Sequence, residues 1–110
     1  MTEEQIKAVA RDYAGKILET DIYLKYSHEK DRIKKHPDLY RQVNEFRESS
    51  FELQNETDQD QLFDRMDAFE REYEKFRENP IVEGFLRAEL NFCRMMQSLN
   101  ELIMDHIDFE

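Results

Sequence analysis

The side chains best placed to do chemistry in this 110-residue sequence are one carboxylate in an apolar helix, one cysteine and three histidines. Glu89 falls where helical spacing calls for an apolar residue, between Phe85 and Phe92. Metal-binding carboxylates in bundle cores use a Glu-x-x-His pattern, but the residue three after Glu89 is Phe92. The sequence therefore favours a structural Glu89, bonded to an arginine, a tyrosine hydroxyl or its symmetry mate, over a perturbed acid or metal ligand.

The histidines and the cysteine lack the spacing of a reactive site. His28-Glu29 begins like a His-Glu-x-x-His zinc motif, but Arg32 stands where the second histidine belongs. Cys93 lies within an apolar face and is predicted to be a packed thiol, and a lone cysteine excludes an intramolecular disulfide. His106 near a helix end is expected to complement the helix dipole or to join an interface. With no glycine-rich phosphate loop and no nucleophile signature, we expect no enzyme and no cofactor.

The elements that must position these residues are predicted to be helices. Gly and Pro number two each, too few for the turns of a sheet protein. Thr2 with Gln5 predicts a capped helix start, and apolar residues then recur at helical intervals as far as Ile33. This section is one long helix or two, with a possible break at Thr20-Asp21. Pro37 ends this section or begins the next.

Two further helices are expected in the middle of the chain. The first carries apolar residues from Leu39 to Leu53 inward and ends in the polar stretch 54–58, where Thr57 or Asp58 is the expected N-cap of the next. The second has the four-and-three spacing of an antiparallel bundle seam. The seam residues are Leu62, Met66, Phe69, Tyr73 and Phe76.

The last helix, from Pro80 to about Phe109, is apolar around most of its circumference. Such a helix must be covered on several sides, so we expect a homodimer built around it. The predicted fold is all-α, an antiparallel bundle of four to five helices in one domain, 1–110. The expected interface residues are Phe85, Glu89, Phe92, Met96, Leu99 and Ile103.

The charge of the chain limits its partners. Sixteen Lys and Arg against 26 Asp and Glu give a net charge of −10, which opposes general contact with nucleic acid. The basic stretch 30–36 is either a small docking patch or, as we favour, cations at a helix C-terminus. No apolar run is long enough to span a membrane, and the N-terminus does not resemble a signal peptide, so we expect a cytoplasmic protein.

The run from Asn79 to Glu89, NPIVEGFLRAE, resembles the "NP-x-V-x-x-F/Y-L-x-A-E" signature of the YlbF/YmcA family. Three further segments are also similar to that family: residues 35–39, Glu45-Phe46 and the closing stretch 99–109. The resemblance implies a small helical regulator that acts by protein contact, in a complex that modulates the RNA-processing endonuclease RNase Y and affects competence, sporulation and biofilm formation. Some members are associated with iron–sulfur clusters held by cysteines, and this chain has only Cys93.

Three hypotheses follow. The first is a regulatory adaptor, working as a homodimer or in a hetero-complex with family members and an RNA-processing enzyme. The second is a homodimer with a purely structural role. The third is a metal- or cluster-dependent sensor that uses Cys93 or Glu89.

Overall fold

The computed structural model describes residues 1–56 and 59–107, and these residues form five α-helices and no strand. In chain order the helices are α1 (Glu3–Ile17), α2 (Asp21–Lys34), α3 (Pro37–Glu56), α4 (Gln59–Glu78) and α5 (Pro80–His106). The prediction of an all-α fold with four to five helices, the last of them long, is confirmed.

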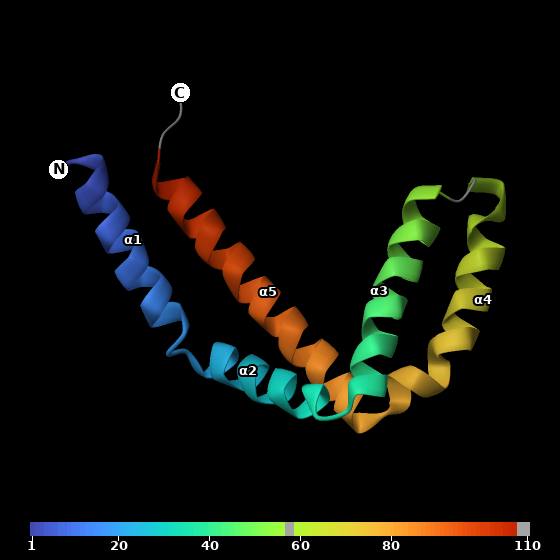
Figure 1. Ribbon diagram of the computed structural model, residues 1–110. Coiled ribbons are helices and arrows are strands. Elements are labelled where there is room, and N and C mark those ends of the chain that lie inside the picture. Colours follow the sequence, from blue (N-terminus) through green and yellow to red (C-terminus); the bar gives the residue numbers. More distant parts are fainter. Residues whose placement is uncertain (57–58, 108–110) are drawn as a thin grey trace.

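The helices are arranged as two arms joined at a base (Figure 1). One arm consists of α1 and the outer half of α5, which run in opposite directions and bring the two termini to the same end of the molecule. The other arm is the α3–α4 hairpin, and α2 crosses the base beside the first half of α5. The molecule measures 54 × 39 × 18 Å. Its thinnest dimension has room for no more than two layers of helices, so most helices have a face that their own chain leaves uncovered.

Local capping chemistry sets the helix starts. Thr2 and Gln5 form the predicted capping box, with both reciprocal hydrogen bonds present. Thr20 is the N-cap of α2, where its hydroxyl accepts from the backbone N–H of Tyr23 and donates to the carbonyl of Ile17. These bonds close one helix and open the next, so the N-terminal section is two helices. Pro37 begins α3, as proline in the first helical turn should.

Of two helix boundaries predicted beyond the middle of the chain, one is wrong and the other is confirmed. Helix α3 continues through Glu56, so the prediction that it stops in a loop from residue 54 was wrong. Gln and Glu are good helix formers, the segment has no Gly or Pro, and the Asn55 amide donates to the carbonyl of Phe51 at 2.8 Å. The predicted N-caps Thr57 and Asp58 lie outside the described residues. The predicted helix start at Asn79-Pro80 is confirmed, with Asn79 as N-cap.

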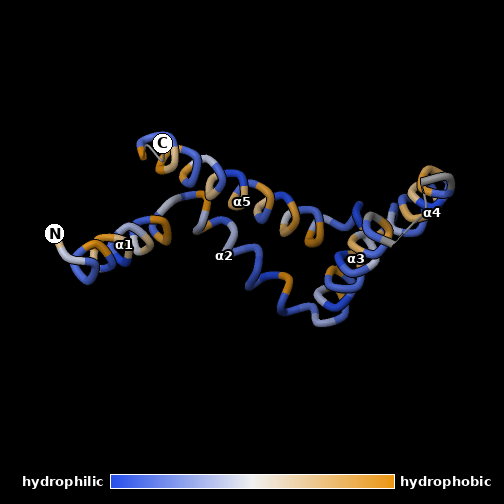
Figure 2. Tube along the Cα trace, turned by 90° about the horizontal axis from the view of Figure 1, so that it is seen from above, coloured by the Kyte–Doolittle hydropathy of each residue, from blue (hydrophilic) through white to orange (hydrophobic). Residues whose placement is uncertain are grey.

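The core lies at the base, where the two arms meet. It is built from four buried side chains, contributed by α2, α3 and α5, with partly buried neighbours that include Tyr26 and Phe76. The four buried residues are Ile33, Val43, Val82 and Phe85. Figure 2 shows that apolar residues recur along α1 and α5 well beyond this core. The largest group of buried side chains therefore lies at the base, and Ile17 on α1 and Leu53 on α3 are buried outside it.

Aromatic rings hold the α3–α4 hairpin together. The ring of Phe46 on α3 stacks on Phe69 with centroids 5.3 Å apart and meets Tyr73 edge-on at 5.2 Å. The seam predicted for α4 faces α3 here, as its spacing required. The hairpin is thus a self-contained arm with an aromatic interior.

Candidate protein-binding surface

A buried carboxylate fixes how α2 crosses α5 at the base. The side chain of Glu29 on α2 is buried, with 3% of the residue exposed, and it lies against the backbone of Gly84 on α5. A Cβ atom at residue 84 would come within 2.8 Å of Oε2 of Glu29. The crossing is therefore close because residue 84 has no side chain.

Two cations of the same helix neutralise this carboxylate. Nζ of Lys25 lies 2.9 Å from Oε1 of Glu29, and Nη1 of Arg32 lies 3.4 Å from Oε2. The hydrogen bond from Lys25 lowers the pKa of Glu29, an effect that burial opposes and that the charges of Lys25 and Arg32 reinforce. Glu29 is thus held ionised at the crossing.

Sequence reasoning missed the structural role of Glu29, which it considered only as part of the rejected His28-Glu29 zinc motif. A signal was present: Tyr26, Glu29 and Ile33 recur three and four residues apart, the spacing of one helix face. That spacing places Glu29 on the inner stripe of α2. Gly84 was considered only as part of the family signature and not as a point of close helix approach.

Glu89 joins α5 to the hairpin arm. Its carboxylate accepts a hydrogen bond from the guanidinium of Arg47 on α3, 42 residues away in sequence. The Glu89 side chain is 27% exposed, so it is half-buried and not enclosed among the apolar residues of its stripe. The guanidinium of Arg47 also lies over the ring of Phe85, 5.5 Å from its centroid. Of the partners expected for Glu89, an arginine is the one present.

The six residues expected at the interface fall into two groups along α5. Phe85 is in the core, Glu89 pairs with Arg47, and Phe92 stacks on Tyr26 with centroids 5.2 Å apart. These three have partners within the chain. Met96 and Leu99 are half-buried on the outer half of the helix, and Ile103 is exposed.

The other candidate reactive residues, which include Cys93 and His106, do not come together in one site. Cys93 is exposed, so the prediction of a packed thiol was wrong: none of the described helices covers the side of α5 that it shares with Leu90. Nδ1 of His106 lies 2.9 Å from the carbonyl oxygen of Leu102 in the last turn of α5. Among the described residues no three or more His, Cys, Asp or Glu side chains gather as metal ligands. A cluster needs several thiolates, so one exposed cysteine does not fit it.

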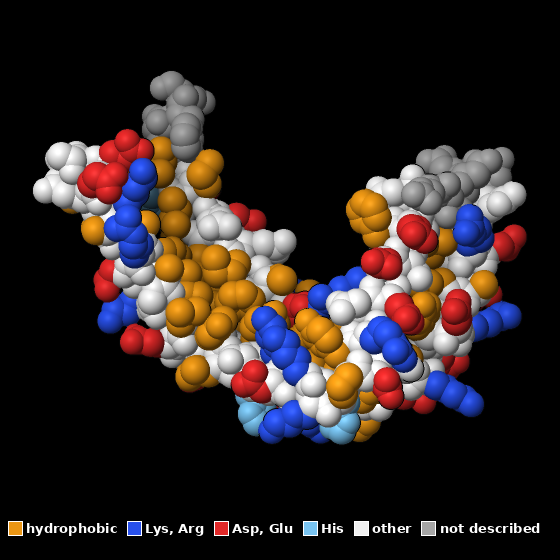
Figure 3. Space-filling view, viewed as in Figure 1, with side chains coloured by type: hydrophobic (Ala, Val, Ile, Leu, Met, Phe, Trp, Pro, Cys, Tyr) orange, Lys and Arg blue, Asp and Glu red, His pale blue; other side chains and the backbone are white. Residues whose placement is uncertain are grey.

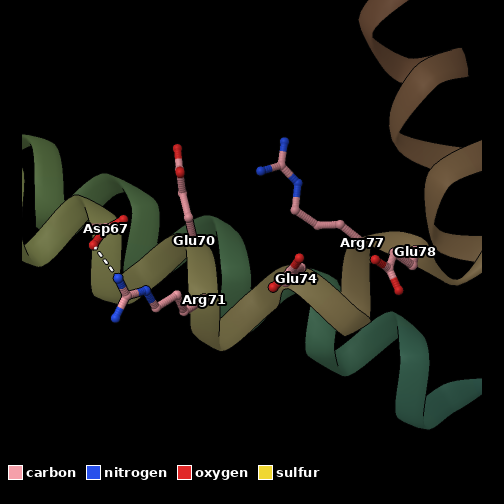
Figure 4. A pocket seen from close by; sticks show the side chains of 6 residues that line it. All are labelled: Asp67, Glu70, Arg71, Glu74, Arg77 and Glu78. Atoms are coloured by element: carbon pink, nitrogen blue, oxygen red, sulfur yellow. Dashed lines mark ion pairs between the residues drawn. The ribbon is translucent and has the colours of Figure 1, made fainter.

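The most prominent hollow of the described surface does not resemble a ligand site. It has a volume of about 440 Å³ and is an open depression lined by side chains of α4 alone (Figure 4). Its walls carry charges of both signs, and Arg71 is already paired with Asp67 at 2.9 Å. Small-molecule sites are concave and mostly apolar. This depression is a solvated helix face.

The largest uncovered feature is an apolar surface on the arm formed by α1 and α5. Figure 3 shows hydrophobic side chains gathered over and between these two helices. We call this surface the α1–α5 face. It comprises Ile6, Val9 and Tyr13 of α1 with Met96, Leu99, Leu102 and Ile103 of α5. Val9 is 52% exposed and Leu102 is 55% exposed, values typical of side chains with no cover from their own chain.

A smaller apolar surface lies towards the end of the α3–α4 hairpin. Phe51 on α3 is exposed, and Phe63 on α4 is 83% exposed. Large aromatic side chains fully open to water are uncommon in monomers unless they contact another molecule. We call these two residues the hairpin-end aromatics.

Charge is distributed unevenly between the two arms. Helices α3 and α4 together hold 12 acidic and 6 basic residues, a net charge of −6. Helix α1 holds three acidic and three basic residues and is neutral, and residues 93–106 of α5 carry only −1. The basic stretch 30–36 lies at the end of α2, with Arg32 and Lys34 in the last turn. This agrees with the interpretation that its cations sit at a helix C-terminus. The hairpin arm is acidic, and the α1–α5 arm has a net charge close to zero.

The described residues thus define a small all-helical protein whose distinctive features are uncovered apolar surfaces and not a reaction site. No described helix has the length and hydropathy needed to cross a membrane. The model of the family described as "Control of competence regulator ComK, YlbF/YmcA" matches residues 6–108. The chain belongs to this family, which confirms the resemblance noted in the sequence, and it is therefore a member of a family of competence-control regulators.

One relative is a UPF0342 protein of Caldicellulosiruptor bescii. It is 22% identical to this chain over 104 residues, which cover 93% of this chain and 87% of the relative. No solved structure matches. The similarity thus extends over nearly the whole of both proteins.

Proposed function

We propose that this protein is a non-catalytic regulatory adaptor of the cytoplasm that acts through contacts with other protein chains. The observation that carries the proposal is the large apolar area exposed on both arms, and the most prominent hollow is an open one lined by charged side chains. Apolar patches of this kind on a folded chain mark protein contacts. Membership in a family of competence-control regulators supports a regulatory role.

The adaptor works as a homodimer, or as a subunit of a hetero-complex with other family members and an RNA-processing endonuclease of the RNase Y type. Regulation of RNA processing, and through it of competence, sporulation and biofilm formation, is what the family resemblance implies. The contact is with the endonuclease and not with its RNA, since the net charge of −10 repels a phosphate backbone.

The hairpin-end aromatics are the expected contact with the endonuclease. Aromatic side chains make the strongest contributions to protein interfaces, and this arm leaves the α1–α5 face free for another chain. Purified protein should retain the soluble part of the source organism's RNase Y in a binding assay. Phe63→Ser should weaken that binding by about tenfold or more.

The matched control is Ile6→Ser, an apolar-to-polar change on the other arm that should leave endonuclease binding unaltered per folded molecule. Binding by wild type that Phe63→Ser does not weaken would place the contact elsewhere. No binding of RNase Y, with only the protein's own copy recovered, would contradict the adaptor function and favour a structural homodimer.

A further inference from the structure

A hollow of about 300 Å³ lies where α2 crosses α5. Three basic side chains line it: Lys25 and Arg32 of α2 and Arg87 of α5. Two acidic side chains, Glu29 and Glu83, also line it, so its net charge is +1 in a chain of net charge −10. The depression on α4 is lined by four acidic and two basic side chains. The hollow at the crossing is therefore positive on an otherwise acidic protein.

Two of these cations keep hydrogen-bond donors for a further anion. Nζ of Lys25 and Nη1 of Arg32 lie 2.9 and 3.4 Å from the buried carboxylate of Glu29. A lysine ammonium has three N–H donors and an arginine guanidinium has five, so one bond to Glu29 uses only part of that capacity. The side chains of Lys25 and Arg32 are 64% and 44% exposed, so they are accessible to a ligand. Glu29 thus holds two cations in place beside the hollow, which lowers the entropy cost of binding an anion there.

The third cation is paired with a carboxylate that a ligand could replace. The guanidinium of Arg87 donates to the carboxylate of Glu83, one turn earlier on α5. Both side chains are more than half exposed, and exposed ion pairs of this kind are weak. An incoming carboxylate could therefore take the position of Glu83 beside Arg87 at little cost.

The hollow continues into a second and more apolar one of about 180 Å³. The two share Lys25, Ala88 and Asn91, and the second adds Asp21 and Ile22. The Ile22 residue is 39% exposed, so an apolar surface is available at this end. We call the two hollows together the α2–α5 groove. A single small anion would occupy only its cationic end, whereas an extended peptide would contact both ends.

We propose that the α2–α5 groove binds an extended acidic segment of another protein. A run of Asp or Glu lies against Lys25, Arg32 and Arg87, and a neighbouring apolar side chain lies against Ile22. Charge complementarity selects such a segment, and the net charge of −10 on the whole chain opposes a nucleic acid in its place.

The inference goes beyond the proposed function, which assigns the endonuclease contact to the hairpin-end aromatics. The groove lies at the base and would give the adaptor a second docking site of different chemistry. Its test uses no endonuclease. A failure of the groove would therefore leave the endonuclease assay unaffected, and the reverse also holds.

The first experiment selects ligands from a random-peptide phage library on immobilised wild-type protein, with Arg87→Glu for counter-selection. The enriched peptides should carry two or more acidic residues beside an apolar one. In fluorescence anisotropy, the most enriched peptide should bind Arg87→Glu about tenfold more weakly than wild type, because the reversed charge repels it. Enriched peptides without acidic residues, or no peptide that distinguishes the two proteins, would overturn the inference.

A variant with the opposite expected effect separates charge from folding. Glu83→Gln removes the competing carboxylate, so it should tighten peptide binding by about twofold to threefold. An unfolded fraction can only weaken binding, so misfolding does not explain a gain. Arg71→Glu, the matched control, alters an exposed pair of the same spacing on α4 and should leave binding unchanged. Equal losses in Arg71→Glu and Arg87→Glu would show a general effect of charge and would overturn the groove.

The apolar end is tested by a cycle between peptide and protein. Serine in place of the apolar residue of the peptide should weaken binding to wild type by about fivefold, and should have little effect on binding to Ile22→Ser. Inorganic phosphate should displace the peptide poorly, since it can contact only the cationic end. Equal binding of the serine peptide to wild type, with ready displacement by phosphate, would overturn the peptide groove in favour of a simple anion site.

Discussion

The carboxylate of Glu29 on α2 occupies the space that a side chain at residue 84 on α5 would need. Oε2 of Glu29 is 2.8 Å from the position of a Cβ at Gly84, and its Cδ is 3.3 Å from it. Such an approach is shorter than any ordinary van der Waals contact, so only glycine fits while Glu29 holds Lys25 and Arg32. The two residues set the crossing of the helices that build the core.

Replacing Gly84 by alanine should lower the free energy of unfolding by about 1–2 kcal/mol, although alanine is the better helix former by about 1 kcal/mol. The matched control is Gly15→Ala on α1, where a Cβ would meet nothing within 4 Å. That variant should be more stable than wild type by up to about 1 kcal/mol. Urea unfolding at fixed protein concentration measures both.

The contact with Glu29 is isolated by a double-mutant cycle. In a Glu29→Ala background the obstructing carboxylate is absent, so Gly84→Ala should stabilise the protein about as much as Gly15→Ala does. Equal effects of Gly84→Ala in both backgrounds would show that the two residues are not coupled, and the close approach would then be wrong.

The ionisation of Glu29 should make stability depend on pH. The hydrogen bond from Lys25 holds the folded pKa of Glu29 below its ordinary value of 4.5. A group with a depressed folded pKa stabilises the protein fully above its unfolded pKa, and that stabilisation is lost as the pH falls through the folded pKa. Wild type should therefore lose more stability than Glu29→Gln as the pH is lowered from about 5 to 3. Parallel curves for the two proteins would contradict this.

The Arg47–Glu89 pair should stabilise the attachment of the hairpin arm by a modest amount. Its side chains are 42% and 27% exposed, so water screens their attraction. A cycle of Arg47→Ala, Glu89→Ala and the double variant should give a coupling energy of about 0.5–1 kcal/mol. Arg71→Ala with Asp67→Ala, an exposed pair within α4, should give less. A coupling indistinguishable from zero for Arg47–Glu89 would mean that the arm is attached by apolar contacts alone.

The break between α1 and α2 should depend on Thr20. Its hydroxyl bonds both Tyr23 and Ile17 in a half-buried site, so Thr20→Ala should cost about 1 kcal/mol of stability. Thr2→Ala removes an equivalent cap at the exposed end of α1 and should cost less. Equal losses for the two variants in thermal unfolding would indicate that the junction has no packing of its own.

Local chemistry allowed most of the helix boundaries to be predicted. Caps at Thr2 and Asn79 and a proline at 37 define positions through bonds between near neighbours, which the sequence displays directly. Helix α3 extends past its predicted end because polar residues that are common in loops also form helices when no glycine or proline interrupts them.

Contacts between segments that are distant in the chain could not be predicted from the sequence. The helical period showed that Ile6, Val9 and Cys93 lie on apolar faces, but it does not say whether anything in the chain covers those faces. The partner of Glu89 is Arg47, which lies 42 residues away in the sequence. An arginine could be expected as the partner, but which arginine could not be predicted. Glu29 was missed because a charged residue in a sequence suggests an exposed side chain. Its charge is neutralised by Lys25 and Arg32 of the same helix, so it can be buried.

The uneven charge of the two arms has a consequence for ionic strength. Salt screens contacts between exposed charges and leaves apolar burial largely intact. The proposed binding of another protein chain through the apolar α1–α5 face should therefore persist from low to high salt. A basic partner attracted by the net charge of −6 on the hairpin should bind more weakly as salt is added, whereas the apolar contact of the hairpin-end aromatics should weaken less. A change in the ionic content of a cell would therefore alter the proposed charge-dependent contacts more than the proposed apolar ones.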